Sequence, residues 1–505
     1  MQAETVNRID SRTKIVVAGL MLTIFLVALD GTIVSTAMPS IVGNLGGFSL
    51  YAWVPSVYLL TQAVSTPIYG KLSDLFGRKR VLFFGIGAFL LGSVTSGAAQ
   101  SMGMLILFRA IQGLGAGALF PVTITIVGDL FSLEQRARIQ GVFSSVWGVS
   151  ALVGPLLGGG LVDHVGWRWI FYLNLPVGLP AVIILWLFFH EERHIRRHAL
   201  DIAGAVLLTS GLSAVLLLLL EGGQAWGWVS VQSALLAIVT GMSLGLFVFV
   251  EQRAPEPVIP LNLFRLRIVA VSSVAALFAG MVMMSVSFAV PLFVQGVLGK
   301  DAFTAGLALA PMTIGWPLAG SMSGRLAIRF GYRATASAGM LFVVLGMGLL
   351  SLLHQSSSFW VVGLDSFVVG VGLGLSSTPM IIAVQSAVAW AQRGAATGTN
   401  LFVRTFGSVV GLAVMGAIIN HATGVYGGSA ATNQSLDVHQ RHAVPPRLLQ
   451  EIHAALFNGI HGAFVASLVA GILGLLVVVN LPGGSAMDHQ YREPEPEPAR
   501  EVREA

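Results

Sequence analysis

Four ionisable side chains stand within long apolar stretches of this 505-residue chain: Asp30, Arg109, Asp365 and Arg404. Charge at such positions is costly and is usually functional. An acid that is buried beside a permanently charged arginine can exchange a proton as the hydration of its surroundings changes. These residue types therefore predict proton coupling, with Asp30 as the main proton carrier and Arg109 as its electrostatic partner.

Asp365 is expected either to act as a second proton site or to attract a cationic solute. A plainer interpretation is a structural bond between Asp30 and Arg109, with an Asp365 that reaches water at the outer membrane edge. Arg404 lies about two or three turns from the inner face, which its long side chain could reach. The residues alone leave these alternatives open.

The stretches that carry these charges have the length of membrane-crossing helices. The chain is 55% hydrophobic and only 10% charged, whereas a soluble chain is about 25% charged. A helix needs about 20 apolar residues to cross a bilayer, and the strands of a barrel are only about ten alternating residues long. We predict an all-α integral membrane protein with fourteen spans, near residues 15–37, 51–70, 81–99, 104–127, 139–161, 171–189, 202–220, 231–250, 268–292, 304–323, 335–353, 359–382, 397–419 and 462–481.

Basic residues predict the orientation of these spans. With a cytoplasmic N-terminus, 23 of the 28 Lys and Arg residues fall in inner segments. The outer loops hold only Arg168, Lys300, Arg441 and Arg447. Because positive charge concentrates on the cytoplasmic side, both termini are predicted to be cytoplasmic, in the inner (cytoplasmic) membrane of a cell. In this arrangement Asp30, Arg109 and Asp365 all lie roughly 8–10 Å below the outer hydrocarbon edge.

Short patterns recur at a nearly constant offset. GKLSDLFGR at 70–78 is echoed at 324–333 with an offset of 254, and the glycine triplet 113, 115, 117 is echoed at 370, 372, 374 with an offset of 257. Pro121 is echoed by Pro379. Two halves related in this way predict a transporter with a central site between them.

The repeat divides the chain into segments of different roles. We predict an N-terminal six-helix bundle, two extra helices, a C-terminal six-helix bundle with a long outer loop, and a disordered cytoplasmic tail, at 1–200, 201–255, 256–483 (loop 420–461) and 484–505. The loop between spans 2 and 3 is predicted to be a conformational latch that closes the inner side. Its residues are Gly70, Asp74, Gly77, Arg78 and Arg80.

Several motifs in order resemble those of one family. GKLSDLFGRKR at 70–80 resembles the loop signature of the major facilitator superfamily, and LFRAIQGLG at 107–115 resembles its span 4 motif. GVSALVGPLLGG at 148–159 resembles the span 5 motif of its antiporters. LDGTIVSTAMP at 29–39 and WRWIFYLNLP at 167–176 are similar to the fourteen-span drug:proton antiporters. Leu75 and Ser35 are departures, since members commonly carry a base and Asn at these positions. In the second copy of the loop motif, Ile328 replaces the acid of the first copy.

The resemblance implies a fold and an activity. It implies two six-helix bundles plus two extra helices, and a proton-coupled exporter of amphipathic, often cationic or aromatic drugs that works by alternating access and confers antibiotic resistance. The antiporter motif would lie between the halves and comprises Gly148, Gly154, Pro155, Gly158 and Gly159. The glycines would flatten one helix face, although plain helix packing is an equally good reading of any one of them.

Span 9 is the expected substrate surface. Methionine and aromatic side chains form adaptable apolar walls, and aromatic faces favour organic cations. The residues are Phe278, Met281, Met284, Phe288 and Gln295. The alternative is that these residues only pack against lipid or other helices, because an apolar membrane span contains such residues in any case.

Other classes of function have little support. The chain has no phosphate-binding G-x-x-x-x-G-K-[ST] and no believable catalytic motif, so we expect no enzyme and no cofactor beyond a proton gradient. His190, His194 and His198 lie in a charged linker, so no metal site is expected there. The expected partners are protons, a small-molecule substrate and the lipid bilayer, with no nucleic acid; a periplasmic adaptor is possible but not indicated. A dedicated exporter of one endogenous metabolite or antibiotic is the alternative, and a non-transporting receptor on this scaffold is less favoured.

Overall fold

The computed structural model describes residues 10–131, 133–191, 201–222, 225–255, 257–389, 392–424, 434–436 and 444–483. Those residues form helices, short 3-10 turns and one isolated bridge between Gly222 and Trp226, with no strand among them. The all-α prediction is confirmed in this part of the chain. His194, His198 and the tail 484–505 lie outside the described residues, as do residues 425–433 and 437–443 and the side chains of Asp74 and Pro155. The predicted outer loop 420–461 is wrong from Pro446 on, where the chain is helical.

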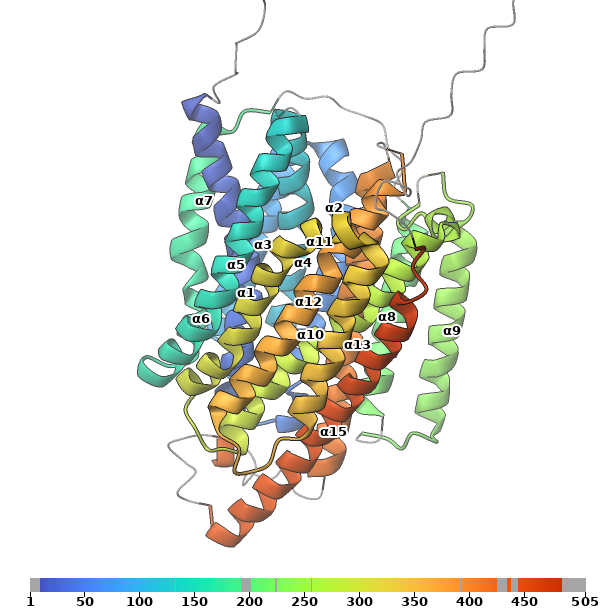
Figure 1. The fold of residues 1–505 in the computed structure, drawn as a ribbon. Coiled ribbons are helices and arrows are strands. Elements are labelled where there is room, and N and C mark those ends of the chain that lie inside the picture. The colour runs from blue at the N-terminus through green and yellow to red at the C-terminus, as the bar shows by residue number, and fades with distance from the viewer. Residues whose placement is uncertain are drawn as a thin grey trace, which may run out of the picture.

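The helices follow the predicted order along the chain (Figure 1). The N-terminal half contains α1 (Ser11–Leu45), η1 (Phe48–Leu50), α2 (Trp53–Phe76), α3 (Arg78–Gly97), α4 (Met102–Leu130), α5 (Leu133–His164), α6 (Trp169–Tyr172) and α7 (Asn174–Phe188). Next come α8 (Ile202–Glu221), α9 (Val231–Glu251) and η2 (Leu261–Arg265). The C-terminal half contains α10 (Arg267–Gly296), α11 (Ala302–Ser351), α12 (Phe359–Ser386), α13 (Arg393–Thr423) and α15 (Pro446–Val478).

Eleven helices of the described chain are long and apolar enough to cross a membrane. Within a bilayer a helix satisfies its own backbone hydrogen bonds, which is why such apolar stretches adopt this form. α2 and α5 are outside this set of eleven. α11 is 50 residues long and has a non-helical backbone at Gly331, where two helices join.

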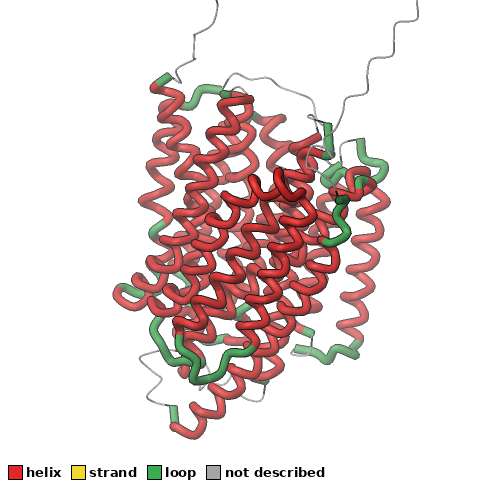
Figure 2. Tube along the Cα trace, viewed as in Figure 1, coloured by secondary structure: helices red, strands yellow, loops and turns green. Residues whose placement is uncertain are grey.

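The helices form two packed groups with a pair beside them. α1 to α5 and α7 contact one another, as do α10 to α13 and α15, while α5 meets α11 and α2 meets α13 between the groups. α8 packs on α9 and also touches both α2 and α13, and α9 stands at the edge of the bundle (Figures 1 and 2). The first turn of α1 and the last turn of α15 lie at one end, which we name the terminal face; the opposite end is the distal face.

The two halves turn in the same way at equivalent glycines. Gly77 separates α2 from α3 with φ 93° and ψ 145°, and Gly331 interrupts α11 with φ 84° and ψ 161°. A side chain is strained in this left-handed region, so glycine is favoured at both positions. The carboxylate of Glu191 accepts the backbone N–H groups of Arg78 (2.6 Å) and Lys79 (3.1 Å) at the first turn of α3.

Glycine contacts repeat between the halves with the same offsets as the sequence patterns. A methyl group at Gly115 of α4 would lie 2.3 Å from the backbone nitrogen of Phe89, and one at Gly372 of α12 would lie 2.5 Å from that of Val343. Phe89 and Val343 are 254 residues apart, as the repeat requires. The remaining glycines of both triplets contact equivalent carbonyl groups: Gly113 that of Tyr58, Gly117 that of Gln62, Gly370 that of Met312 and Gly374 that of Trp316.

The start of the fourth helix of each half is also equivalent. Ser101 caps α4 by accepting the N–H of Met104 (3.3 Å), and Ser358 caps α12 by accepting that of Trp360 (3.4 Å). Serine at this position satisfies an otherwise free backbone donor. Equivalent caps and equivalent glycine contacts hold α4 and α12 in the same place within their halves.

We predict that Gly115→Ala and Gly372→Ala both destabilise the protein, because the new methyl group collides with backbone atoms that cannot rotate away. Each change should lower the apparent melting temperature in detergent by at least about 2 °C. Gly87→Ala is the matched control, since Gly87 has open space around it. Equal melting temperatures for the Gly115 and Gly87 variants would contradict this account of the packing.

Candidate functional site

A buried ion pair lies at the centre of the N-terminal half. Arg109 of α4 donates from Nη1 to Asp30 Oδ2 of α1 at 2.6 Å. Asp30 is 0% exposed and Arg109 is 1% exposed, so both charges are removed from solvent. The predicted partners therefore meet, and their charges cancel inside the bundle.

Two amides complete the shell of the carboxylate. Gln112 accepts from Arg109 Nη1 at 2.8 Å and donates from Nε2 to Asp30 Oδ1 at 2.8 Å, so it closes a ring with the ion pair. Asn174 at the start of α7 also donates to Asp30 Oδ1, at 3.4 Å. Both amides belong to motifs that predicted the family, but we did not predict either as a site residue. Their place in those motifs was the signal that could have found them.

Aromatic rings enclose the arginine. The guanidinium carbon of Arg109 lies 4.0 Å from the ring centre of Tyr58 and 5.9 Å from that of Phe171. A cation is attracted to the face of such a ring, most strongly where water is excluded. The Tyr58 hydroxyl is buried, and no hydrogen-bond partner for it occurs among the described residues. Nothing in the sequence identified Tyr58.

Helix contacts explain why these side chains converge. Arg109 and Gln112 are three residues apart and share a face of α4. A methyl group at Gly92 of α3 would lie 2.5 Å from the backbone nitrogen of Gln112, so α3 presses on α4 at this level. The contact of Gly113 with the Tyr58 carbonyl brings α2 equally near on another face. Gly92 of α3 and Gly113 of α4 thus set how closely these helices approach one another at the site.

The two halves are hydrogen-bonded to each other near the distal face. Gln295 of α10 donates from Nε2 to the Thr36 carbonyl at 2.9 Å and accepts from Ser40 Oγ at 3.1 Å. Tyr51 donates to the Phe288 carbonyl at 2.9 Å, and their rings lie edge to face. Phe288 and Gln295 are each 2% exposed, so the other half covers them in this conformation.

Two further contacts strengthen this closure. Asp163 at the end of α5 accepts the backbone N–H groups of Ala302 (3.2 Å) and Phe303 (2.8 Å) at the start of α11. An acid at a helix N-terminus is stabilised by the unpaired N–H groups and the helix dipole. Asn420 of α13 donates to the Ser49 carbonyl at 2.9 Å. The side-chain hydrogen bonds between the halves that we find in the described chain all lie at the distal end.

The fold and the motifs agree with a comparison to known families. The sequence profile of the Major Facilitator Superfamily matches residues 20–412. The chain belongs to this superfamily. Multidrug resistance protein 3 of Bacillus subtilis is 33% identical over 493 residues, covering 94% of this chain and 96% of that protein. The multidrug transporter protein MdtP of the same organism is 36% identical over 415 residues, covering 82% and 77%.

The chain is therefore a multi-pass membrane transporter of the multidrug efflux family rather than an enzyme. A fungal relative, the acurin A biosynthesis cluster transporter of Aspergillus aculeatus, is 33% identical over 404 residues, covering 78% of this chain and 73% of that protein. Among solved structures, a bacterial homologue of the human lysosomal transporter Spinster has a TM-score of 0.68 at 16% identity, covering 96% and 99%. That likeness shows the fold.

Asp365 stands apart from the ion pair of this transporter. It lies in the second turn of α12 and is 5% exposed. Within the described residues no hydrogen bond or ion pair reaches its carboxylate, so the structure does not bring it together with Asp30 and Arg109. Its role as a second proton site or an attractor of cations stays a prediction.

The predicted substrate residues on α10 point to different neighbours. Phe278 packs against α15, where a methyl group at Gly474 would lie 3.1 Å from its Cβ, and Met281 packs through its backbone on Gly411 of α13. Both side chains are half-buried, as is that of Met284. The predicted role of these residues in a cavity stays open to test, whereas Phe288 and Gln295 belong to the distal closure in this conformation.

Two glycines of the antiporter motif fit α5 onto α1 of the same half. A methyl group at Gly154 would lie 2.0 Å from the hydroxyl of Thr32, and one at Gly158 would lie 2.7 Å from the carbonyl of Ile33. Thr32 uses this closeness to donate to the Ser150 carbonyl at 3.1 Å. α1 carries Asp30 two residues before Thr32, so this packing also holds the acid in place.

The other two glycines face the opposite half. A methyl group at Gly159 would lie 2.5 Å from the Ala302 carbonyl of α11, beside the distal closure. One at Gly148 would lie 3.7 Å from Pro317, which leaves a looser contact. α5 therefore carries small residues toward both α1 and α11, which lets the helix backbones approach closely on two sides.

The predicted latch residues lie at the terminal face. Arg78 pairs through Nε with Asp129 of α4 at 2.8 Å, and Arg80 is exposed. Gly70 has open space around it. Asp129 and Glu191, which contact Arg78, both belong to the N-terminal half, while the side chain of Asp74 lies outside what the structure describes.

We predict that breaking the ion pair on one side costs more than removing both charges. Arg109→Met leaves Asp30 buried without a counter-charge, which costs several kcal/mol, about 3–5. The double variant Asp30→Asn/Arg109→Met leaves no charge and should melt at a higher temperature in detergent than Arg109→Met alone. A double variant that melts below both single variants would show that the charges do not interact as the geometry indicates.

Proposed function

We propose that this transporter is a proton-coupled antiporter that exports amphipathic, often cationic or aromatic compounds. The fully buried carboxylate of Asp30, paired with Arg109 at 2.6 Å, carries the proposal. A neutral ion pair can remain in an apolar bundle, but a lone arginine cannot do so cheaply. Adding a proton to Asp30 removes the counter-charge of Arg109 and so favours a rearrangement that gives the arginine water or a new partner.

The surrounding groups suit such a rearrangement. Gln112 already bonds both members of the pair, so it can keep Arg109 partly satisfied when Asp30 is protonated. Tyr58 offers its ring and a hydroxyl that has no hydrogen-bond partner among the described residues. The proton state of one acid is thereby linked to the positions of α1, α2 and α4, which is what coupling to a conformational cycle needs.

Alternating access would use contacts that form at one face at a time. In the conformation described, hydrogen bonds between the halves hold the distal face. We infer that the loop from Gly70 to Arg80 pairs with the other half in the opposite state, when the distal contacts are broken. Each set must be weak enough to open during every cycle.

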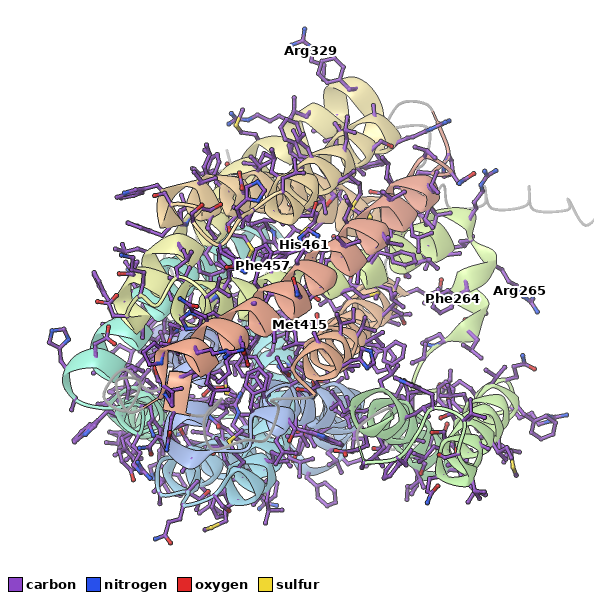
Figure 3. All side chains as sticks on the ribbon, turned by 90° about the horizontal axis from the view of Figure 1, so that it is seen from below. Phe264, Arg265, Arg329, Met415, Phe457 and His461 are labelled. Atoms are coloured by element: carbon purple, nitrogen blue, oxygen red, sulfur yellow. The ribbon has the colours of Figure 1, made fainter. Side chains whose placement is uncertain are left out.

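The membrane arrangement is part of the proposal. Eleven helices of the described chain meet the requirements for a span. We count α2, α5 and the part of α11 beyond Gly331 as three further spans, which gives the fourteen that we propose. The exposed Arg265 and Arg329 project away from the bundle (Figure 3). Basic residues at the ends of spans favour the cytoplasmic side, so we place the terminal face in the cytoplasm and the transporter in the inner membrane, with domains at 1–200, 201–255 and 256–483.

Asp30→Asn is expected to abolish proton release driven by drug uptake, because the amide cannot take up and lose a proton. The measurement uses sealed everted vesicles with a pH-sensitive dye and ethidium as the drug, normalised to the amount of transporter. Exchange of ethidium against ethidium without a pH gradient should persist, since it needs no proton. Undiminished proton release from this variant would remove Asp30 from the coupling.

The matched control is Asp10→Asn, since Asp10 is an exposed aspartate just before α1. It should leave proton release unchanged. Loss of release in both variants would show that the assay responds to something other than the buried acid, and loss of ethidium exchange in Asp30→Asn would point to a structural role of the ion pair.

The distal closure gives a second test, made simple because the chain contains no cysteine. Ser40 and Gln295 are hydrogen-bonded across the halves at 3.1 Å. With cysteine at both positions, a short bis-methanethiosulfonate cross-linker, which joins the two thiols through disulfides, should stop transport, and a reducing agent that cleaves those disulfides should restore it. Each single-cysteine variant serves as control. Full transport by the cross-linked protein would show that the distal face does not open.

A dedicated exporter of a single metabolite is the second candidate. One observation favours it: a relative of similar identity is named for a biosynthesis cluster, that of acurin A. The two candidates differ in breadth, because a dedicated exporter has polar groups that match one solute. Resistance to a panel of unrelated compounds, in cells without their own pumps, separates them.

A further inference from the structure

Arg404 of α13 is a charged residue inside the bundle that the ion pair of the N-terminal half does not use. It is the twelfth residue of α13, about 17 Å from the start of that helix. No hydrogen bond or ion pair of its guanidinium occurs within the described chain. Its described contact is with the ring of Trp316 on α11, 6.0 Å from the guanidinium carbon.

Arg404 faces the interior of the protein rather than lipid. From Thr399 to Asn420 no residue of α13 is exposed, and α10, α15, α2, α8 and α12 all contact this helix. The backbone at Arg404 lies directly against α10, where a methyl group at Gly280 would lie 2.1 Å from its carbonyl oxygen. The Arg404 side chain is half-buried. Its nitrogens have no hydrogen-bond partner among the described residues, and packing does not bury them completely. Its donors therefore remain accessible to a ligand.

Trp316 offers a second free donor at the same place. It is half-buried, and the described chain contains no hydrogen-bond acceptor for its indole N–H. Trp316 is the fifteenth residue of α11 and lies about midway along the 302–330 segment. A guanidinium, an indole N–H and an aromatic face thus lie together near the middle of the membrane, where transporters of this architecture bind their solutes.

This group also lies close to the other half. Pro317, next to Trp316, is the residue that faces Gly148 of the antiporter motif on α5. The contact there is loose, at 3.7 Å from an added methyl group. A solute held by Arg404 and Trp316 would therefore lie beside the boundary at which the two halves move.

We propose that Arg404 and Trp316 form the binding site for an anionic group, such as a carboxylate or sulfonate, on an aromatic substrate. The proposal deepens the proposed export function and rests on it. An unpaired arginine is expensive within a membrane, and an anion that accepts its N–H groups offsets that cost. The Trp316 ring would stack on the aromatic part of the solute, and its N–H would supply a further hydrogen bond. Aromatic acids and zwitterions then belong to the substrates, beside cations.

Equilibrium binding tests this site without depending on transport. Purified full-length protein in detergent is titrated by calorimetry with 2-naphthylacetate and with 2-(2-naphthyl)ethylammonium, which share one ring and carry opposite charges. Arg404→Gln should weaken binding of the acid by about tenfold, the effect of one lost charged hydrogen bond, and leave the ammonium compound unaffected. Arg404→Lys should retain part of the affinity, because it keeps the charge.

The control variant is Arg329→Gln, which removes an exposed arginine of the same half and should change neither affinity. Failure of the wild-type protein to bind the acid, or an equal loss for both compounds in Arg404→Gln, overturns the proposal. Selective loss of acid binding supports it. Selective acid binding by a protein that moves no solute in a proton gradient would leave this site standing and overturn the proposed antiport instead.

Discussion

The structure depends on one constraint: a charge taken out of water must have a partner. Asp30 and Arg109 meet this constraint at 2.6 Å, and the amides of Gln112 and Asn174 occupy the remaining oxygen of the carboxylate. The pair is stable only while both charges are present, because either one alone is an uncompensated charge in an apolar bundle. A proton is the smallest agent that can change this balance, which links the chemistry of one acid to the packing of three helices.

The packing that holds this pair is made by residues without side chains. Gly113 and Gly115 let α2 and α3 approach α4 so closely that a methyl group would overlap backbone atoms. Bilayers provide no hydrophobic force between helices, so close contact of this kind is a main source of association. The same contacts recur at Gly370 and Gly372, and this is why a repeat of glycines could predict the arrangement of two whole halves.

Sequence reasoning succeeded for features that follow directly from the order and spacing of residues along the chain. Span length gave the helices, the offset gave the equivalence of Gly77 and Gly331, and the cost of buried charge singled out Asp30 and Arg109. It failed for Tyr58, because a neutral residue in an apolar span gives no sign of which way its helix is rotated. It also could not tell that Phe288 and Gln295 would be covered, since which face is closed is a property of the conformation and not of the composition.

The halves share their packing but differ in their chemistry. The repeat places Ser366 of α12 where α4 has Arg109, and Ser366 donates to the carbonyl of its own helix at Val362. The C-terminal half therefore has no counterpart of this arginine, although its glycine contacts match. Its own charges, Asp365 and Arg404, lie on helices that run in opposite directions. The repeat accounts for the equal packing of the halves but not for their unequal charge. We therefore infer that the halves have different roles: the N-terminal half holds the proton and the C-terminal half faces the solute. Helix α5 touches both α1 and α11, so it can transmit a movement of one half to the other.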